Sequence, residues 1–345
     1  MPLTVTVQPA GRSFAVERDE PILAAAIRQG IGLPYGCKDG ACGTCKSRLL
    51  EGRVIHGTHQ HKALSVQEEQ AGWMLTCCAA PQTDVVIEVR VVPGAGDFPV
   101  RKMPCRVTTI ERAAPDVVII KLQLPANDRL LYRAGQYVEF ILRDQSRRSY
   151  SMANAPHTQE EQPGIELHVR HMPGGKFTDH VFGGMKEREI LRMEGPFGSF
   201  FLRDSDKPII FLASGTGFAP IKAIIDHMRF KRIDRPATLY WGCRSKADLY
   251  QHEWCLQAVA SMPNLNYVPV LSEPKPEDNW AGRLGFVHRA VMADFPDLRG
   301  HQVYACGVPV MVESAQRDFV AQCRLPAEEF YADAFTSEAD KHEED

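Results

Sequence analysis

The sequence predicts a protein of three domains: a small α+β domain, an antiparallel β-barrel and an α/β domain with a parallel sheet. The first observation is length, because 345 residues exceed what one ordinary core holds. The second is a run of turn-broken, strand-like segments between Cys105 and Asp204, which indicates a barrel. The third is a change after Lys207, where short apolar strands alternate with helical patterns as they do around parallel sheets.

The composition excludes several classes of protein. Hydrophobic content of 44% and charged content of 24% are typical of a globular chain, and a formal net charge of −3 lacks the basic footprint of a nucleic-acid binder. The opening residues MPLTVTVQPAGRSF do not resemble a signal peptide, and no apolar run approaches the ~18 residues of a membrane span. We therefore expect a cytoplasmic protein with neither a nucleic acid nor a membrane as partner.

The N-terminal α+β domain is predicted over residues 1–95. LTVTVQP and RSFAVE indicate a hairpin, PILAAAIRQG indicates a short helix, and the alternation over 85–92 indicates a closing strand. The Pro/Gly-rich stretch VVPGAGDFPVRKMP predicts a linker at about 93–103. The barrel is then placed at 103–204, the α/β domain at 205–335, and a mobile polar tail at 336–345.

Ten cysteines are many for a cytosolic chain, and half of them lie in its first quarter. Four follow C-x4-C-x2-C with a distant fourth, the plant-type spacing for a [2Fe–2S] cluster: Cys37, Cys42, Cys45 and Cys77. Interleaved glycines allow the backbone to turn sharply and aim N–H groups at the sulfurs. Structural zinc, which prefers paired C-x2-C knuckles, and a disulfide are the competing interpretations. Cys78 is surplus, and we expect its side chain to point away from the ligands.

Residues 147–156, RRSYSMANAP, predict a flavin contact. In R-x-Y-S, the Arg148 guanidinium can fork onto a phosphate, Tyr150 can lie on the isoalloxazine, and the Ser151 hydroxyl can reach a ring edge. The stretch LHVRHMPGGKFT follows, and glycines at a helix start suit a pyrophosphate. Its candidate cofactor-binding residues are Val169, Arg170, Gly174, Gly175, Lys176 and Thr178. A solvated strand charge explains Arg170 equally well.

The segment SGTGFAP at 214–220 lies between a predicted strand and a helix that is expected to start at Pro220. Close backbone approach and a helix N-terminus suit a dinucleotide pyrophosphate at Gly215, Thr216 and Gly217. Pro220 replaces the third glycine of G-x-G-x-x-G, which argues against an ordinary Rossmann dehydrogenase. Cys306 and Gly307 end a later strand, at the carboxyl edge where ligands bind in open α/β sheets. A buried apolar thiol is the equally supported alternative for Cys306.

With these motifs in order, residues 3–335 resemble reductases of the ferredoxin–NADP reductase superfamily that carry an N-terminal plant-type [2Fe–2S] domain. Several stretches resemble the CDP-6-deoxy-Δ3,4-glucoseen reductases: CKDGACGTCKS, LTCC, AGQYVEF, RRSYSMANAP, GTGFAPIK, YWG, GFVH and YACG. The stretches RSYSMAN, LHVRHMPGGKF and GTGFAPIKA are also similar to reductases of aromatic-ring dioxygenases such as the terephthalate system.

The resemblance implies a β-grasp ferredoxin domain, an antiparallel flavin-binding β-barrel and a nicotinamide-binding α/β domain with a parallel sheet. It also implies FAD rather than FMN. Arg148, Tyr150 and Ser151 would hold the flavin. Its phosphates would be held by Gly174, Gly175, Lys176 and Thr178. Cys306 would stand beside the nicotinamide, and Phe335 in YADAF would cover the flavin until nicotinamide displaces it. Ser151, Cys306 and Phe335 are thus the catalytic candidates.

The three motifs together predict one electron-transfer chain. Hydride carries two electrons, a [2Fe–2S] cluster accepts one, and a flavin manages both. We expect electrons to pass from NADH to FAD, to [2Fe–2S], and on to a soluble redox acceptor protein: a CDP-hexulose dehydrase or an oxygenase component. NADPH stays possible because Arg244 or Lys246 could grip a 2′-phosphate, although Asp248 opposes it.

Two other classes of function are less well supported by the sequence. A non-catalytic redox sensor would leave the flavin and dinucleotide motifs without purpose. A self-sufficient oxygenase would need an oxygen-activating metal site, and the Cys-x-His and Cys-x-x-His pairs of a Rieske centre are absent.

Overall fold

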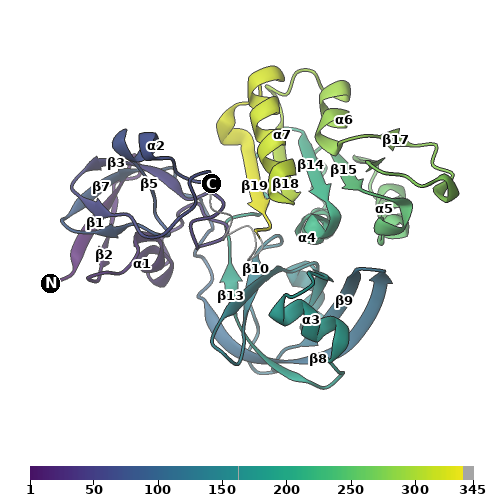
Figure 1. Ribbon diagram of the computed structural model, residues 1–345, viewed down its shortest axis with the longest axis horizontal. Coiled ribbons are helices and arrows are strands. Elements are labelled where there is room, and N and C mark those ends of the chain that lie inside the picture. Colours follow the sequence, from purple (N-terminus) through teal and green to yellow (C-terminus); the bar gives the residue numbers. More distant parts are fainter. Residues whose placement is uncertain (162, 337–345) are drawn as a thin grey trace. The chain divides into compact units, whose positions relative to one another are not determined.

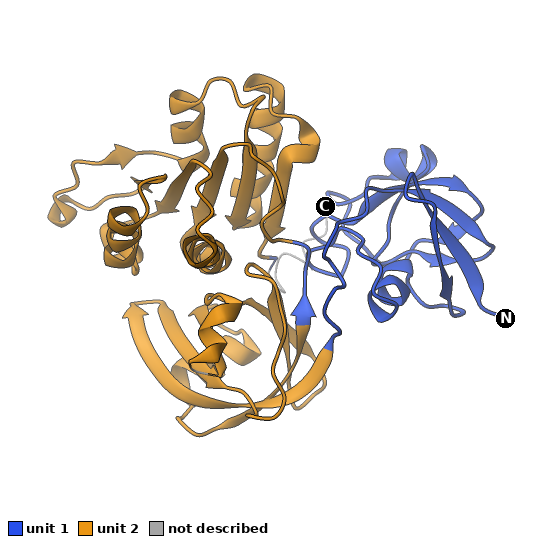
Figure 2. Ribbon diagram, turned by 180° about the vertical axis from the view of Figure 1, so that it is seen from behind, with its two compact units in different colours: residues 1–100, 196–199, 336–345 blue, residues 101–195, 200–335 orange. Residues whose placement is uncertain are grey.

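The computed structural model describes residues 1–161 and 163–336, so most of the tail that was predicted to be mobile lies outside the described residues. The chain forms two compact units (Figure 2). The first contains Met1–Val100 together with Pro196–Ser199, and the second contains Arg101–Gly195 and Phe200–Phe335. The second unit therefore holds both the predicted barrel and the predicted α/β domain.

A mixed five-stranded sheet with strand order β2-β1-β7-β3-β5 forms the first unit. β1 pairs antiparallel with β2 and parallel with β7, and alternate residues such as Val5, Val7 and Phe14 are buried. Helix α1 buries its apolar side, and the predicted hairpin, helix and closing strand are confirmed. The elements are β1 (Leu3–Gln8), β2 (Arg12–Val16), α1 (Ile22–Arg28), β3 (Lys46–Glu51), β4 (Val54–Ile55), α2 (Val66–Gln70), β5 (Trp73–Leu75), β6 (Ala80–Pro81) and β7 (Val85–Glu88).

The first part of the predicted linker is packed against the first unit. The Val92 N–H donates to the Gly32 carbonyl at 2.7 Å, and Ala95 is buried. A Cβ on Gly32 would lie 2.4 Å from the Val92 oxygen, so this contact requires glycine. The strand that follows, β8, begins at Arg101, two residues before the predicted start of the barrel.

The predicted antiparallel barrel is confirmed as a six-stranded sheet with order β11-β10-β13-β8-β9-β12. A bridge between Met152 and Leu167 brings the two outer strands together, and the Ala153 N–H donates to the Glu166 carbonyl at 2.7 Å. Alternating residues of the strands fill the interior. The elements are β8 (Arg101–Ala114), β9 (Val117–Gln123), β10 (Tyr137–Ile141), β11 (Arg147–Ser151), η1 (Pro156–Glu160), β12 (Gly164–Arg170), α3 (Lys176–Gly183) and β13 (Ile190–Phe197).

The α/β domain has a parallel sheet with order β17-β16-β15-β14-β18-β19 (Figure 1). Helices α4 and α5 pack on one face, and α6 and α7 on the other. Its strands are β14 (Ile209–Ser214), β15 (Ala237–Cys243), β16 (Leu265–Leu271), β17 (Arg283–Leu284), β18 (Gln302–Gly307) and β19 (Phe330–Ala334). Its helices are η2 (Gly215–Gly217), α4 (Phe218–Lys231), η3 (Lys246–Asp248), α5 (His252–Ser261), η4 (Pro276–Asp278), α6 (Val287–Asp294), α7 (Pro309–Gln322) and η5 (Ala327–Glu329).

The sheet order creates a switch point at β14. From this strand the chain proceeds to β15 on one side, and later returns to β18 on the other. In open α/β sheets, ligands bind outside the carboxyl ends of the strands at such a point, here β14 and β18. Helix α4 starts at Phe218 rather than at the predicted Pro220. Pro220 therefore lies in the first turn, where its missing N–H leaves no hydrogen bond unmade.

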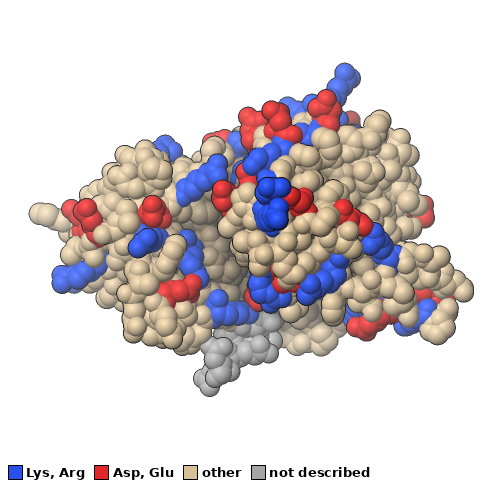
Figure 3. All heavy atoms as spheres, turned by 90° about the horizontal axis from the view of Figure 1, so that it is seen from above, with Lys and Arg blue, Asp and Glu red and all other residues tan. Residues whose placement is uncertain are grey.

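The surface agrees with the near-neutral charge of the sequence. Basic and acidic side chains are interspersed on the face seen in Figure 3. Among the described residues, none of the helices combines the length and apolar character needed to cross a membrane.

Candidate functional site

The four predicted cluster ligands come together in two pairs. The Cys37 N–H and the Cys42 N–H each lie 3.4 Å from the sulfur of the other residue, and the Cys45 and Cys77 sulfurs are 3.2 Å apart. Within the described part of the chain, no three His, Cys, Asp or Glu side chains gather around a single ion position. A zinc ion needs four ligands around one centre, whereas a two-iron cluster needs two thiolates for each iron. The paired arrangement therefore fits [2Fe–2S].

The glycines of the cysteine loop are required by its shape. Gly40 and Gly43 have φ of +78° and +74°, and a Cβ on Gly40 would lie 2.8 Å from the His59 Cβ. Contact with the Cys37 sulfur, and then with the Thr44 hydroxyl, lowers the pKa of Cys42 to about 6. Contact with a neighbouring thiol, together with burial, raises the pKa of Cys37 and of Cys45, so the thiolate, which is the form that binds iron, is favoured at Cys42 rather than throughout the loop.

The expectation that Cys78 points away from the ligands is wrong. Its sulfur lies 3.5 Å from the sulfur of Cys77. Residues 75–79 form a turn in which the N–H groups of Cys78 and Ala79 both donate to the Leu75 carbonyl. Consecutive side chains in such a turn diverge by about 100°, not the 180° of a strand, so both sulfurs face the cysteine loop.

The R-x-Y-S residues lie on β11, at one end of the barrel sheet. The Tyr150 ring packs 5.0 Å from the Phe177 ring and 6.0 Å from the Phe140 ring. Burial raises the pKa of Tyr150, so its hydroxyl stays protonated. Arg148 is half-buried, and its guanidinium donates to the Arg147 carbonyl at 2.7 Å. An aromatic side chain and a cation are thus presented together, which suits a flavin and its phosphate.

The Thr178 side chain stabilises the turn before α3 by a hydrogen bond inside that turn. The Thr178 hydroxyl donates to the Met172 carbonyl at 2.8 Å, and a Cβ on Gly175 would lie 2.6 Å from that hydroxyl oxygen. Lys176 is exposed and pairs with Asp144. The groups left to reach a phosphate are Lys176 and the backbone N–H groups at the start of α3. Val169 has its side chain in the barrel core, so only its backbone can face a cofactor.

Two of the three catalytic candidates, Ser151 and Cys306, meet at a buried carboxylate. Ser151 Oγ donates to Asp333 Oδ2 at 3.3 Å, and Cys306 Sγ lies 3.9 Å from the same oxygen. The Phe335 N–H donates to the Gly307 carbonyl at 2.8 Å, which holds the backbone of the third candidate beside the end of β18. Burial, with Asp333 nearby, raises the pKa of Cys306, so this group is a neutral thiol.

Asp333 is the residue of this group that sequence reasoning missed. It is 9% exposed and is the last residue but one of strand β19, two residues before Phe335. A signal was present, because residues two apart in an extended segment project to the same side. Because Asp333 lies two residues before Phe335, its carboxylate could have been predicted to belong to the same site as Phe335.

The predicted dinucleotide loop lies at the switch point, where glycines allow two loops to touch. A Cβ on Gly217 would lie 2.2 Å from the Cys306 oxygen, and one on Gly307 would lie 2.1 Å from Ser214 Oγ. Ser214 Oγ also accepts the Val308 N–H at 3.0 Å. The loops after β14 and β18 are therefore held together at the carboxyl edge of the sheet.

Arg170 lies at the dinucleotide loop. A Cβ on Gly215 would lie 2.8 Å from its Nη1, and its Nε lies 3.2 Å from Asp116 Oδ2. The same Asp116 oxygen pairs with Arg244 at 3.0 Å. This position favours a contact with the dinucleotide over the flavin contact that was expected from sequence.

The fold and these sites define a class: flavin- and iron–sulfur-dependent oxidoreductases that use a nicotinamide dinucleotide. Three family models agree with it. They are the 2Fe-2S iron-sulfur cluster binding domain at residues 5–82, the oxidoreductase FAD-binding domain at 104–202 and the oxidoreductase NAD-binding domain at 211–317.

Relatives match this chain along almost the whole of both lengths. The CDP-6-deoxy-L-threo-D-glycero-4-hexulose-3-dehydrase reductase of Yersinia pseudotuberculosis is 38% identical, over 97% of this chain and 99% of its own. The phenol hydroxylase P5 protein of Acinetobacter pittii is also 38% identical, over 99% and 96%. The crystal structure of an Amycolatopsis cytochrome P450 reductase matches with a TM-score of 0.80 at 33% identity, over 97% and 99%. The chain belongs to the family of reductases that join a [2Fe–2S] domain to FAD- and NAD-binding oxidoreductase domains.

Proposed function

We propose that this reductase delivers electrons to a separate, soluble redox protein in the cytoplasm, and that the acceptor is a CDP-hexulose dehydrase of deoxysugar biosynthesis. The supporting observation is the likeness to a dehydrase reductase along almost the whole of both chains. A ring-hydroxylating oxygenase component is the second candidate, because the phenol hydroxylase protein is equally identical to this chain.

The chemistry belongs to the cofactors, and the chain supplies positions for them. When bound, FAD takes a hydride from NADH and passes its two electrons singly to the [2Fe–2S] cluster. The backbone N–H groups of the loop from Gly215 to Gly217 would face the dinucleotide. Gly215 leaves room for the Arg170 guanidinium, which adds a cation beside the loop, and Gly217 leaves room for the Cys306 carbonyl. Cys306 and Ser151 border the reacting rings, while Phe335 excludes water from them until nicotinamide arrives.

The proposed ligands and contacts remain those expected from sequence, with two changes. The four cysteines would hold the cluster through their thiolates. Asp333 joins the catalytic group by accepting the Ser151 hydrogen bond, and Arg170 moves from the flavin to the dinucleotide.

The acceptor is tested by adding each candidate protein, with its own substrate, to the purified reductase and following NADH oxidation coupled to product. We expect turnover with the dehydrase, loss of it in Cys42→Ser, and retention of ferricyanide reduction in that variant. Cys78→Ser is the matched control, because it removes a neighbouring sulfur that is surplus to the four ligands. Turnover by the oxygenase component alone would replace the dehydrase, and undiminished turnover in Cys42→Ser would refute electron exit through the cluster.

A further inference from the structure

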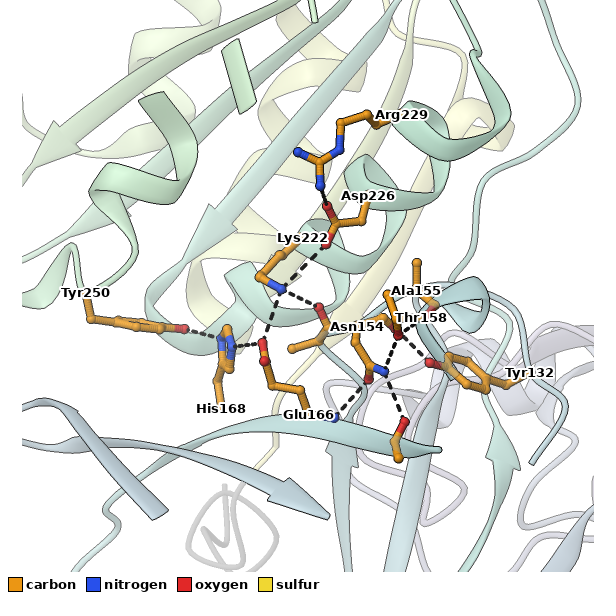
Figure 4. Close-up of polar contacts among 12 residues, drawn as sticks. Tyr132, Asn154, Ala155, Thr158, Glu166, His168, Lys222, Asp226, Arg229 and Tyr250 are labelled. Carbon is orange, nitrogen blue, oxygen red and sulfur yellow. Dashed lines mark hydrogen bonds and ion pairs between the residues drawn. The ribbon is translucent and has the colours of Figure 1, made fainter. Parts of the chain in front are cut away.

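A network of buried charges lies between the barrel and the α/β domain, and Lys222 is at its centre (Figure 4). The Lys222 ammonium lies 3.2 Å from the Ala153 carbonyl, 3.2 Å from Glu166 Oε1 and 3.6 Å from Asp226 Oδ2. Its side chain is only 9% exposed. The three donors of the ammonium thus meet three acceptors, one from its own helix and two from the barrel.

The partners of Lys222 are themselves held in place. His168 Nε2 lies 3.1 Å from Glu166 Oε1, and His168 Nδ1 lies 2.9 Å from the Tyr250 hydroxyl. Burial lowers the pKa of His168, so its ring is neutral and donates one N–H to the carboxylate. Asp226 Oδ1 accepts from Arg229 at 2.6 Å. Two carboxylates and two cations therefore balance, and no charge is left unpaired in the network.

Lys222 and its two partners from the barrel, Ala153 and Glu166, each lie within a few residues of a group in the proposed site. These two partners are called the barrel anchors below. Ala153 is two residues after Ser151, Glu166 is four residues before Arg170, and Lys222 is five residues after Gly217. The hydrogen bond from the Ala153 N–H to the Glu166 carbonyl joins the two barrel anchors directly. One ammonium thus connects the flavin strand to the first turns of α4, which follow the dinucleotide loop.

Stability alone does not explain such a group. A buried ion pair is often no more stabilising than apolar side chains of similar volume. By contrast, misplacing reacting groups by ~1 Å can cost about 100-fold in rate. We propose that Lys222 is a positioning residue for hydride transfer, whose ammonium fixes the dinucleotide loop against the flavin-binding strands. The inference rests on the proposed flavin and dinucleotide sites.

The experiment compares Lys222→Met with Lys231→Met in the holoenzyme. Lys231 is the matched control because it lies on the same helix and is exposed. In Lys222→Met we expect full FAD and iron content and an NADH dissociation constant within about threefold of wild type. The rate constant of flavin reduction at saturating NADH should fall by at least about tenfold. Lys222→Arg should recover most of it, because a guanidinium can reach the same oxygens.

A second readout does not depend on activity. Amide hydrogen exchange over residues 214–221 should accelerate in Lys222→Met, because the loop loses its anchor, and should not change in Lys231→Met. A wild-type saturating rate with unchanged exchange in Lys222→Met would overturn the proposal. If that variant fails to retain FAD, the isosteric Glu166→Gln tests the same contact, and a wild-type rate there is equally decisive. Failure of wild-type protein to oxidise NADH would instead refute the proposed function.

Discussion

Replacing Cys306 by alanine should slow hydride transfer without removing the flavin. Cys306 is fully buried at the carboxyl end of β18, and its sulfur lies 3.9 Å from the carboxylate that accepts the Ser151 hydroxyl. In the proposed site this sulfur borders the reacting rings. The variant should therefore lose a contact that fixes the distance between the flavin and nicotinamide rings. The barrel and the residues that bind the flavin phosphates should not change.

The size of the effect has two parts. Deleting one buried atom of this size costs about 1–2 kcal/mol of unfolding free energy, because a small cavity is left. If the flavin and nicotinamide rings are held less firmly, flavin reduction should slow by about 10–100-fold, which is roughly 1.4–2.7 kcal/mol in the activation free energy of hydride transfer. The two parts can be separated with Cys323→Ala, which deletes an equally buried sulfur on the opposite face of the same sheet. That control should lose similar stability and no rate.

The assay is stopped-flow reduction of bound FAD at saturating NADH, with thermal unfolding measured in parallel. Because burial raises the pKa of Cys306 above the ordinary 9.0, the thiol stays protonated and the ratio of wild-type to variant rates should be constant between about pH 6 and pH 8.5. Flavin reduction by Cys306→Ala within about twofold of the wild-type rate would refute the reasoning. Cys306 would then be a packed thiol and no more.

Three further results are expected. Gly217→Ala should keep FAD but lose at least about tenfold in kcat/KM for NADH, because its Cβ would lie 2.2 Å from the Cys306 oxygen; unchanged kinetics would contradict this loop geometry. NADH should be preferred over NADPH by about tenfold or more in kcat/KM, since Arg244 is already paired with Asp116; an NADPH preference would reverse it. Despite burial, His168 and Lys222 lower the pKa of Glu166 from 4.5 to about 2. The ionised Glu166 carboxylate therefore adds at most about 3 kcal/mol to the free energy of unfolding above pH 4.5, and this contribution is lost as the pH falls toward 2. Glu166→Gln should therefore be less stable than wild type at about pH 7 and approach it in acid, and a pH-independent difference would contradict the pairing.

Several features were predictable because their signal is local. The spacing of Cys37, Cys42 and Cys45 places three thiolates on one loop, and no knowledge of the remaining fold is needed to see it. The glycines after β14 likewise lie between a strand and a helix that are adjacent in sequence. The hairpin of β1 and β2 was predictable for the same reason, because its two strand-like segments are separated only by a short turn that contains Gly11.

The sequence by itself therefore determined the three kinds of domain, the cofactor motifs and their order. Only the tertiary structure decided which distant residues share a site. Ser151 and Asp333 are 182 positions apart, and they meet because the end of β11 lies beside the end of β19. Arg170 reaches Gly215, and Lys222 reaches Glu166, for the same reason. Periodicity within a segment reports which face of that segment is buried, but it contains no record of which other segment covers that face.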